Sequence, residues 1–358
     1  MRDQLLSTEV VCSVRWCDGT VHILDQRMLP DRSVWLSCVQ ATEVAQAIRT
    51  LSVRGAAAIA ICAAYAVAMS VRRHFRCNDQ WFDSVLRDIA ELESARPTVF
   101  NLLQVLAHLR DQLQRHSSAD HLPALMEAEA VAIHQCDREA NLAMAEYGLG
   151  LIRRHQEGAQ CLMTHGNAGA LATGGFGTAL GVVRAAWRRQ LVERIYTDET
   201  RPLLLGSRLT AWELAQEHIP VTVVADSAAS HLMKTEPITW LVLGADRIAA
   251  NGDVVGKIGS YQLSVAAMHH GVRVMVVASS CCIDMSLCHG DEVVLEERAA
   301  GELLAMTGED LGGEVAAFNP VYDITPADLI DFLVTEKGVV DRPDAEKLAQ
   351  LMCRKRLH

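Results

Sequence analysis

From residue 158 onward, short apolar runs alternate with segments of helical periodicity, and this alternation constrains the fold more than any other feature of the sequence. The predicted strands span residues 160–165, 192–197, 221–225, 239–243 and 272–278. The predicted helices between them span residues 178–190, 207–217 and 260–270. Strand–helix alternation predicts βαβ units and a parallel sheet. Because such sheets bind ligands at the carboxyl ends of their strands, we expect the functional site there.

The region before this sheet has a different pattern. Residues 10–16 and 20–25 are β-prone and flank Asp18-Gly19, which predicts a hairpin. The predicted helices that follow span residues 41–50, 56–72, 79–94, 98–115 and 122–154. We therefore expect an α/β protein with two domains, as its length also suggests. Residues 1–157 form a helix-rich N-terminal domain with a short hairpin, and residues 158–358 form a parallel-sheet domain.

Composition excludes several classes of protein. The formal net charge is -11 and no basic stripe is present, so we expect no nucleic-acid partner. The apolar run 55–71 is Ala-rich and short for a membrane span, which favours a buried helix, and residues 1–10 lack the core of a signal peptide. The 11 cysteines are scattered without a CxxC pair, which argues against a disulfide framework or a metal site. Reduced thiols indicate a cytoplasmic protein.

The first two predicted strands end in polar segments. His165-Gly166-Asn167 follows the first, ahead of a glycine-rich stretch that would let backbone amides approach a phosphate or would serve only as a tight turn. It does not match a dinucleotide fingerprint. The second strand end holds two acids, Asp198 and Glu199, followed by two arginines. An ion-pair network and a catalytic cluster are equally consistent with that pattern.

Asp246 is the strongest catalytic candidate. It follows an apolar strand and the pair Gly244-Ala245. A carboxyl group at the end of a buried strand is well placed for general acid–base catalysis, and partial burial would raise its pKa as that role requires. The structural alternative is a helix cap or an ion pair with Arg247.

Several helix starts carry features that favour an anion. Gly256 and Lys257 precede a predicted helix at residue 260, which predicts a phosphate-binding turn, although an ordinary turn has the same residues. Arg54, Gly55 and Ala56 open the helix 56–72, and Arg96 precedes another helix start. Each motif alone is more often structural. Their coincidence favours a phosphorylated substrate.

Taken together, these motifs resemble those of the methylthioribose-1-phosphate isomerase family, which also includes archaeal ribose-1,5-bisphosphate isomerase and the regulatory subunits of eukaryotic initiation factor 2B. The resemblance covers nearly the whole chain. It is carried by residues 54–60, 96–102, 167–184, 198–214, 225–233, 244–259 and 335–339.

The resemblance implies a helical N-terminal domain, a Rossmann-like C-terminal domain and a homodimer. It implies an aldose–ketose isomerase of a sugar phosphorylated on its anomeric carbon, working in methionine salvage with no metal or organic cofactor. Asp246 would be the proton donor that assists ring opening. The groups that hold the phosphate and the sugar hydroxyls would be Arg54, Gly55, Ala56, Arg96, Gly256 and Lys257.

Three positions depart from the family pattern. Gly166 stands where the family has a catalytic cysteine, Leu205 where it has glutamine, and Gly256 where it often has asparagine. Three interpretations follow. In the first, which we favour, hydrogen moves by a hydride shift that needs no thiol. In the second, another group replaces the thiol, and His165 and Cys161 are the nearest in sequence. In the third, the chain has lost activity or changed its substrate.

Other classes of function remain as alternatives. A non-catalytic sensor of a phosphorylated ligand would tolerate the loss of the thiol. An isomerase of a different sugar 1-phosphate would keep the same phosphate site. A dinucleotide-dependent dehydrogenase is suggested only by the sheet, and the glycine pattern argues against it.

Overall fold

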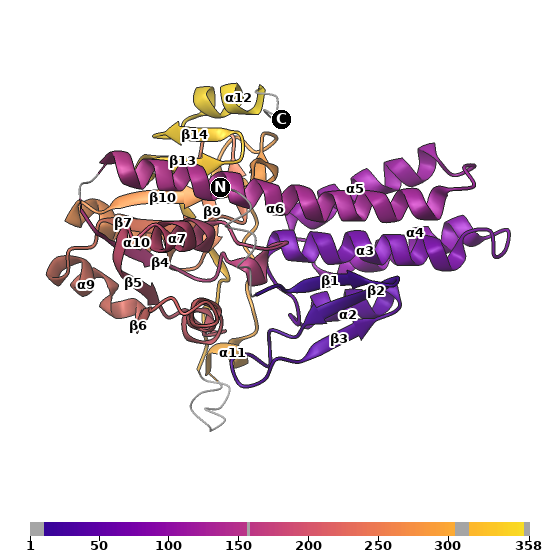
Figure 1. Ribbon diagram of the computed structural model, residues 1–358, viewed down its shortest axis with the longest axis horizontal. Helices are drawn as coiled ribbons and strands as arrows, with labels where there is room; N and C mark the ends of the chain where they lie inside the picture. The colour runs from indigo at the N-terminus through magenta and orange to yellow at the C-terminus, as the bar shows by residue number, and fades with distance from the viewer. Residues whose placement is uncertain (1–10, 156–157, 305–314, 354–358) are drawn as a thin grey trace. The chain divides into compact units, whose positions relative to one another are not determined.

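A computed structural model describes residues 11–155, 158–304 and 315–353, and they divide into two units (Figure 1). Unit 1 contains the chain up to Leu142 together with Gly169–Gly177, and unit 2 contains Ala143–Ala168 and the chain from Thr178 onward. The boundary predicted after residue 157 lies at a position outside the described residues and stays a prediction. Residues Gly169–Gly177 belong to unit 1, although the segments before and after them belong to unit 2. The sequence analysis does not predict this exchange.

Unit 1 opens with a three-stranded antiparallel sheet of order β1-β2-β3. Its strands are β1 (Val14–Cys17), β2 (Thr20–Leu24) and β3 (Trp35–Cys38). Asp18 and Gly19 have φ values of 51° and 79°, as a two-residue hairpin turn requires. The predicted hairpin is therefore confirmed, whereas β3 was not predicted.

The helices of unit 1 pack around α3. They are α2 (Ala41–Arg49), α3 (Ala56–His74), α4 (Trp81–Ala95), α5 (Phe100–Arg115) and α6 (Leu122–His155), which continues into unit 2. All residues of α3 from Ala58 to Val71 are buried. This helix is long and apolar enough to cross a membrane, but 78% of its apolar window is buried inside the protein. That burial is typical of a core helix, as predicted.

Unit 2 is built on a seven-stranded sheet of order β14-β13-β10-β7-β4-β5-β6. All neighbouring strands are parallel except β13 and β14. The strands are β4 (Gln160–Thr164), β5 (Val192–Asp198), β6 (Thr222–Val224), β7 (Trp240–Gly244), β10 (Arg273–Val277), β13 (Phe332–Thr335) and β14 (Gly338–Asp341). Every residue of β4 is buried, as expected of a central parallel strand. The predicted fold class is confirmed, although β13 and β14 were not predicted.

Helices lie between these strands, and one more follows the last of them. They are α7 (Ala179–Arg188), α8 (Trp212–Ala215), α9 (Ala229–Thr235), α10 (Ser260–His270), α11 (Ala300–Leu304) and α12 (Ala345–Cys353). The segment η2 (Gly206–Ala211), predicted as an ordinary helix, is a π-helix that continues into α8. The Glu199 carboxylate accepts hydrogen bonds from the first two amides of η2, those of Gly206 (3.0 Å) and Ser207 (3.2 Å).

A second, four-stranded sheet of order β11-β8-β9-β12 was not predicted. Its strands are β8 (Arg247–Ala249), β9 (Val254–Lys257), β11 (Ile283–Asp284) and β12 (Tyr322–Thr325). Gly256 and Lys257, which the sequence placed in a turn, are therefore the last two residues of a strand. The sequence signal was weak because each of these strands has only two to four residues.

Candidate active site

The structure places the predicted strand-end residues of unit 2 at one edge of the seven-stranded sheet. Strands β7, β4 and β5 are adjacent and parallel, so the residues that follow them lie at the same edge. His165 follows β4, Asp198 ends β5, and Asp246 comes two residues after β7. This is the edge where parallel sheets bind ligands.

Asp246 lies between the two sheets of unit 2. Its amide donates a hydrogen bond to the carbonyl of Val255 (2.9 Å), and this bond places Asp246 beside the Gly256-Lys257 end of β9. The residue is partly buried. A carboxyl group and an ammonium group from different parts of the sequence therefore belong to the same local structure.

Glycine is required at the end of β7. A Cβ on Gly244 would lie 2.4 Å from the Cβ of Ala168, a distance that real Cβ atoms do not reach. Gly256 is similar, since a Cβ there would lie 2.7 Å from the Ser260 hydroxyl oxygen. Both glycines allow the backbone of neighbouring segments to approach the position of Asp246.

The amino terminus of α10 has an internal partner for two of its amides. One oxygen of Asp323 accepts hydrogen bonds from the amides of Gly259 (2.7 Å) and Tyr261 (3.2 Å). Burial raises the pKa of Asp323 above its ordinary value. An internal carboxyl group thus occupies these two amides, and the phosphate-binding role of Gly256 and Lys257 stays a prediction.

Gly166 adopts a left-handed conformation with φ of 63°. A Cβ at this position would lie 3.3 Å from the Cβ and 3.4 Å from the Cγ of Lys257. The aliphatic part of the lysine therefore packs directly against the glycine that stands in place of the family cysteine.

The structure argues against His165 and Cys161 as replacements for that cysteine. The imidazole of His165 is buried, Nδ1 lies 2.8 Å from an Asp198 oxygen, and Nε2 lies 2.9 Å from the carbonyl of Ile258. Both ring nitrogens are therefore committed to internal partners. Cys161 is near the amino end of β4, far from the carboxyl edge, and burial raises its pKa to about 11. These contacts argue against both residues as the base, and replacement of the thiol by another group stays a prediction.

The acids and arginines at the end of β5 form internal hydrogen bonds. Asp198 accepts from His165 (2.8 Å), and Glu199 accepts from the amides of Gly206 and Ser207. Arg201 and Arg208 each donate to a backbone carbonyl, that of Leu303 and that of Leu203 (both 2.8 Å). The role of these four residues stays a prediction.

A network of buried charges lies beside them. Arg184 of α7 is fully buried and donates to Glu213 (2.6 Å) and to Glu217 (2.7 Å). The second oxygen of Glu213 accepts a hydrogen bond from the side chain of Asn167 (3.1 Å). This network runs from α7 to the residue after Gly166.

The predicted residues of unit 1 lie at the amino terminus of α3. Gly55 is the N-cap, with φ of 91°, and a Cβ on it would lie 2.4 Å from the backbone of Ala172. The first turn of α3 contains no acidic residue and no side-chain cap. Arg54 and Ala56 flank the glycine, and backbone amides at such a helix start attract anions.

Arg96 is the C-cap of α4. Only residues 75–80 separate α3 from α4, and the two helices pack against each other, so they run in opposite directions. Arg96 therefore lies at the same end of the helical bundle as Arg54. The sequence placed Arg54 and Arg96 before two separate helix starts, and their role in binding an anion stays a prediction.

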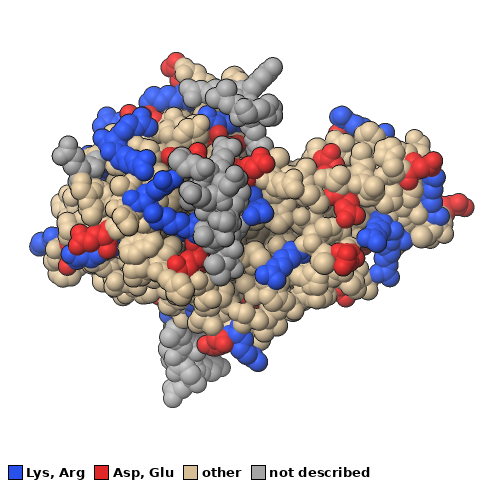
Figure 2. Space-filling view, viewed as in Figure 1, with Lys and Arg blue, Asp and Glu red and all other residues tan. Residues whose placement is uncertain are grey.

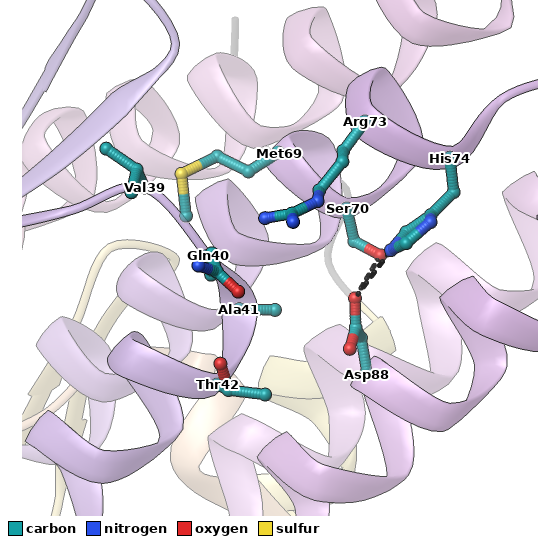
Figure 3. A pocket seen from close by; sticks show the side chains of 9 residues that line it. All are labelled: Val39, Gln40, Ala41, Thr42, Met69, Ser70, Arg73, His74 and Asp88. Atoms are coloured by element: carbon teal, nitrogen blue, oxygen red, sulfur yellow. Dashed lines mark hydrogen bonds and ion pairs between the residues drawn. The ribbon is translucent and has the colours of Figure 1, made fainter. Parts of the chain in front are cut away.

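A pocket elsewhere in unit 1 contains none of the predicted site residues (Figure 3). Its volume is about 120 Å³. The Ser70 hydroxyl on its wall donates to Asp88 (2.6 Å), and His74 lies 3.7 Å from the same carboxylate. These polar groups are already paired with each other. The lining residues are Val39, Gln40, Ala41, Thr42, Met69, Ser70, Arg73, His74 and Asp88.

Comparison with known proteins identifies the family. A model of the initiation factor 2 subunit family matches residues 52–342. The chain belongs to this family. It is 58% identical over 359 residues to a methylthioribose-1-phosphate isomerase of Pseudomonas fluorescens (strain Pf0-1), and 57% identical over 358 residues to that of Pseudomonas entomophila (strain L48). Both alignments cover 100% of each chain.

Solved structures of the family have the same fold. The 5-methylthioribose 1-phosphate isomerase from Pyrococcus horikoshii OT3 is 34% identical, with a TM-score of 0.90 and 98% of each chain covered. The translation initiation factor eIF-2B subunit delta from A. fulgidus is also 34% identical, with a TM-score of 0.83, covering 95% of this chain and 99% of that one. The predicted family and fold are confirmed. A family that contains both enzymes and translation factors makes the site residues decisive for function.

Sequence reasoning missed the side chains that support the site. The sequence analysis names His165 and Asp198 but does not predict their pairing, and it does not predict that Asp323 bonds the start of α10. The available signal was a histidine and an aspartate at the ends of two strands that the alternation pattern makes adjacent. Nothing in the sequence indicated that β12 brings Asp323 to the start of α10.

Proposed function

We propose that this protein is an aldose–ketose isomerase that converts 5-methylthioribose 1-phosphate to 5-methylthioribulose 1-phosphate, a step of methionine salvage. The relatives that it matches over its full length carry the name of this enzyme. The observation in the structure that carries the proposal is the position of Asp246, at the carboxyl end of β7 and beside Lys257. A sensor would need the cation but not the carboxyl group.

Each unit carries predicted phosphate-binding groups of its own. In unit 2 these are Lys257 and the Gly256 backbone, and in unit 1 they are Arg54, Gly55, Ala56 and Arg96. The first turn of α3 has no acidic residue and no side-chain cap, which supports an anion at that helix start.

Asp246 can perform both proton transfers of the reaction. Its protonated carboxyl group donates a proton to the ring oxygen as the bond from that oxygen to C1 breaks. The hydrogen on C2 then moves with its electron pair to C1. The C2 hydroxyl returns a proton to the Asp246 carboxylate as the C2 carbonyl forms, so the atoms and charges balance.

The surroundings of this position favour a direct hydride shift over an enediol. Gly166 has no side chain, and Leu205 is apolar and only 4% exposed. His165 has both nitrogens bonded internally. Positions 165, 166 and 205 therefore supply no free second base in place of the family cysteine.

Turnover of 5-methylthioribose 1-phosphate, followed by NMR in deuterated water, tests the proposal. Conversion without deuterium at C1 is expected from a hydride shift. Deuterium uptake would contradict the shift while keeping the isomerase. Measurable binding without conversion would favour the alternative that the chain is a ligand sensor, which the loss of the cysteine at Gly166 makes the next candidate.

The variant Asp246→Asn tests whether this carboxyl group is needed for turnover, as an isomerase requires and a ligand sensor does not. Loss of a general acid–base group lowers kcat by about 10²- to 10⁴-fold, and substrate binding should persist. Asp328→Asn is the matched control, because Asp328 is exposed in the same unit and should keep full turnover. Equal activity of the two variants would remove Asp246 from the mechanism.

We also propose that the enzyme is a cytoplasmic homodimer. All 11 cysteines are free thiols. On the face shown in Figure 2, basic and acidic side chains both occur among the described residues.

Tyr261, Val265 and Met268 of α10 are 46%, 39% and 63% exposed, and their spacing places them on one face of the helix. This apolar stripe would suit a second copy of the chain, and light scattering of the purified protein with Val265→Glu tests it.

A further inference from the structure

Both ring nitrogens of His165 lie within hydrogen-bond distance of protein groups, and one of these groups is the backbone carbonyl of Lys257. The side chain of His165 is 2% exposed. Nδ1 lies 2.8 and 2.9 Å from the two oxygens of Asp198. Nε2 lies 3.2 Å from the carbonyl of Lys257 and 2.9 Å from that of Ile258. Because a carbonyl oxygen only accepts, Nε2 must carry a hydrogen.

The two carbonyls belong to the turn that joins β9 to α10. The Lys257 carbonyl also accepts a hydrogen bond from the Ser260 hydroxyl (2.7 Å). Gly259, with φ of 109°, lies directly against the imidazole, since a Cβ on it would be 2.6 Å from the ring carbon Cε1. Asp323 holds the amides on the other side of the same turn. The turn is thus fixed by side chains from strands that are distant in the sequence.

Lys257 is the last residue of β9, and its stem packs against Gly166. A lysine side chain has about 2 kcal/mol of rotamer entropy, which is lost when its ammonium group is held in one place. The position of the Lys257 backbone therefore determines how many side-chain conformations bring the ammonium group to the phosphate. A carbonyl that loses its buried donor must find another partner, and the turn would move to provide one.

We propose that His165 is a positioning residue, whose Nε2–H holds the 257–258 carbonyls so that Lys257 is set to bind the substrate phosphate. This inference rests on the proposed function, which gives Lys257 that role. His165 touches no reacting atom, because both of its nitrogens have internal partners. Asp198 fixes the ring so that Nε2 faces the turn.

Two isosteric variants separate the two sides of the ring. The amide nitrogen of glutamine reaches the position of Nε2, so His165→Gln keeps a donor to the carbonyls and gives up the contact with Asp198. The amide of asparagine reaches only the position of Nδ1, so His165→Asn keeps the contact with Asp198 and removes the donor to the turn. A merely structural role would make both variants equally poor.

The expected result is a split in steady-state kinetics with 5-methylthioribose 1-phosphate. His165→Asn should raise KM by about tenfold, the cost of a lost hydrogen bond of ordinary strength, with kcat changed much less. His165→Gln should keep KM within about threefold of the wild type. Hydrogen exchange of residues 256–262 should accelerate in His165→Asn and not in His165→Gln. Thermal unfolding verifies that both variants fold.

Lys257→Ala and its combination with His165→Asn complete the test. If the histidine acts through the lysine, the double variant should have the KM of Lys257→Ala alone, because the two effects are not additive. If Lys257→Ala raises KM but His165→Asn does not, this inference fails and the proposed function stands. If Lys257→Ala leaves KM unchanged, the phosphate role of Lys257 fails, and the inference fails with it.

Discussion

The candidate site residues of unit 1 and those of unit 2 are held in place by different forces. In unit 1, the start of α3 is fixed by close packing: Gly55 lies against the backbone of Ala172, and the helix behind it is buried along most of its length. In unit 2, the strand ends are fixed by buried charges, among them the His165–Asp198 and Arg184–Glu213 pairs. The residues of unit 1 should therefore be sensitive to added volume and those of unit 2 to lost charge.

The largest effect is expected when one partner of the Arg184–Glu213 pair is removed. Arg184→Met leaves the buried Glu213 without its cation and should lower the free energy of unfolding by about 3–5 kcal/mol. Arg188→Met is the comparison on the same helix, since Arg188 is 21% exposed and its partner Glu217 also has an ion pair with Arg184. It should cost less than Arg184→Met, because Glu217 keeps one cation. Urea unfolding compares the two, and equal losses would argue against charge as the main force in unit 2.

Added volume tests unit 1. Gly55→Ala forces a Cβ to within 2.4 Å of Ala172 and imposes a φ of 91° on alanine, so we expect a loss of at least about 2 kcal/mol and weaker substrate binding. Gly150→Ala in α6 is the control, because its nearest neighbouring atom is 3.8 Å away. It should be neutral or stabilise by up to about 1 kcal/mol. A tolerated Gly55→Ala would show that packing does not fix the start of α3.

The charge on His165 predicts a pH dependence for unit 2. Burial lowers its pKa, but the charge and hydrogen bond of Asp198 raise it more, so the folded-state pKa lies above the ordinary value. A raised histidine pKa contributes stability that is fully present below the unfolded value of about 6.5 and is lost as pH rises through the folded pKa. The difference in unfolding free energy between wild type and His165→Gln should therefore shrink from pH 6 toward alkaline pH. A difference that grew with pH would contradict this sign.

The smallest effect is expected at Gly166. Gly166→Ala and Gly271→Ala both place alanine at a positive φ, 63° and 71°, and each should cost about 1–2 kcal/mol. Only the first adds a Cβ beside Lys257, since nothing lies within 4 Å of the second. We expect KM to rise only in Gly166→Ala. An equal KM in both variants would show that the contact between position 166 and Lys257 does not affect phosphate binding.

The elements with strong periodicity were predictable, and the contacts between them were not. Helix α3 and strand β4 have patterns that leave little choice, and the structure confirms both within two residues at each end. Asp246 was located correctly at the end of β7, because an apolar strand followed by glycine is a local signal. Its catalytic role stays a prediction.

The failures have a common physical cause. Strand β12 begins at Tyr322, 68 residues after β9 begins at Val254, yet it pairs with β9 and brings Asp323 to the amides at the start of α10. A strand of four residues has too few side chains for a period to be recognised. The sequence therefore suggested a phosphate at a helix start that an internal carboxyl group occupies.

The π-helix η2 also determines which residues face α7. An α-helix turns by about 100° per residue, and the wider turn of η2 alters the rotation at which α8 emerges. Glu213 lies just beyond that wider turn, and its two oxygens reach Arg184 on one side and Asn167 on the other. Loss of a single residue from Gly206–Ala211 would restore ordinary helical winding and turn Glu213 away from both partners. The number of residues in η2 is therefore as constrained as any side chain in the site, and natural insertions or deletions should avoid this segment.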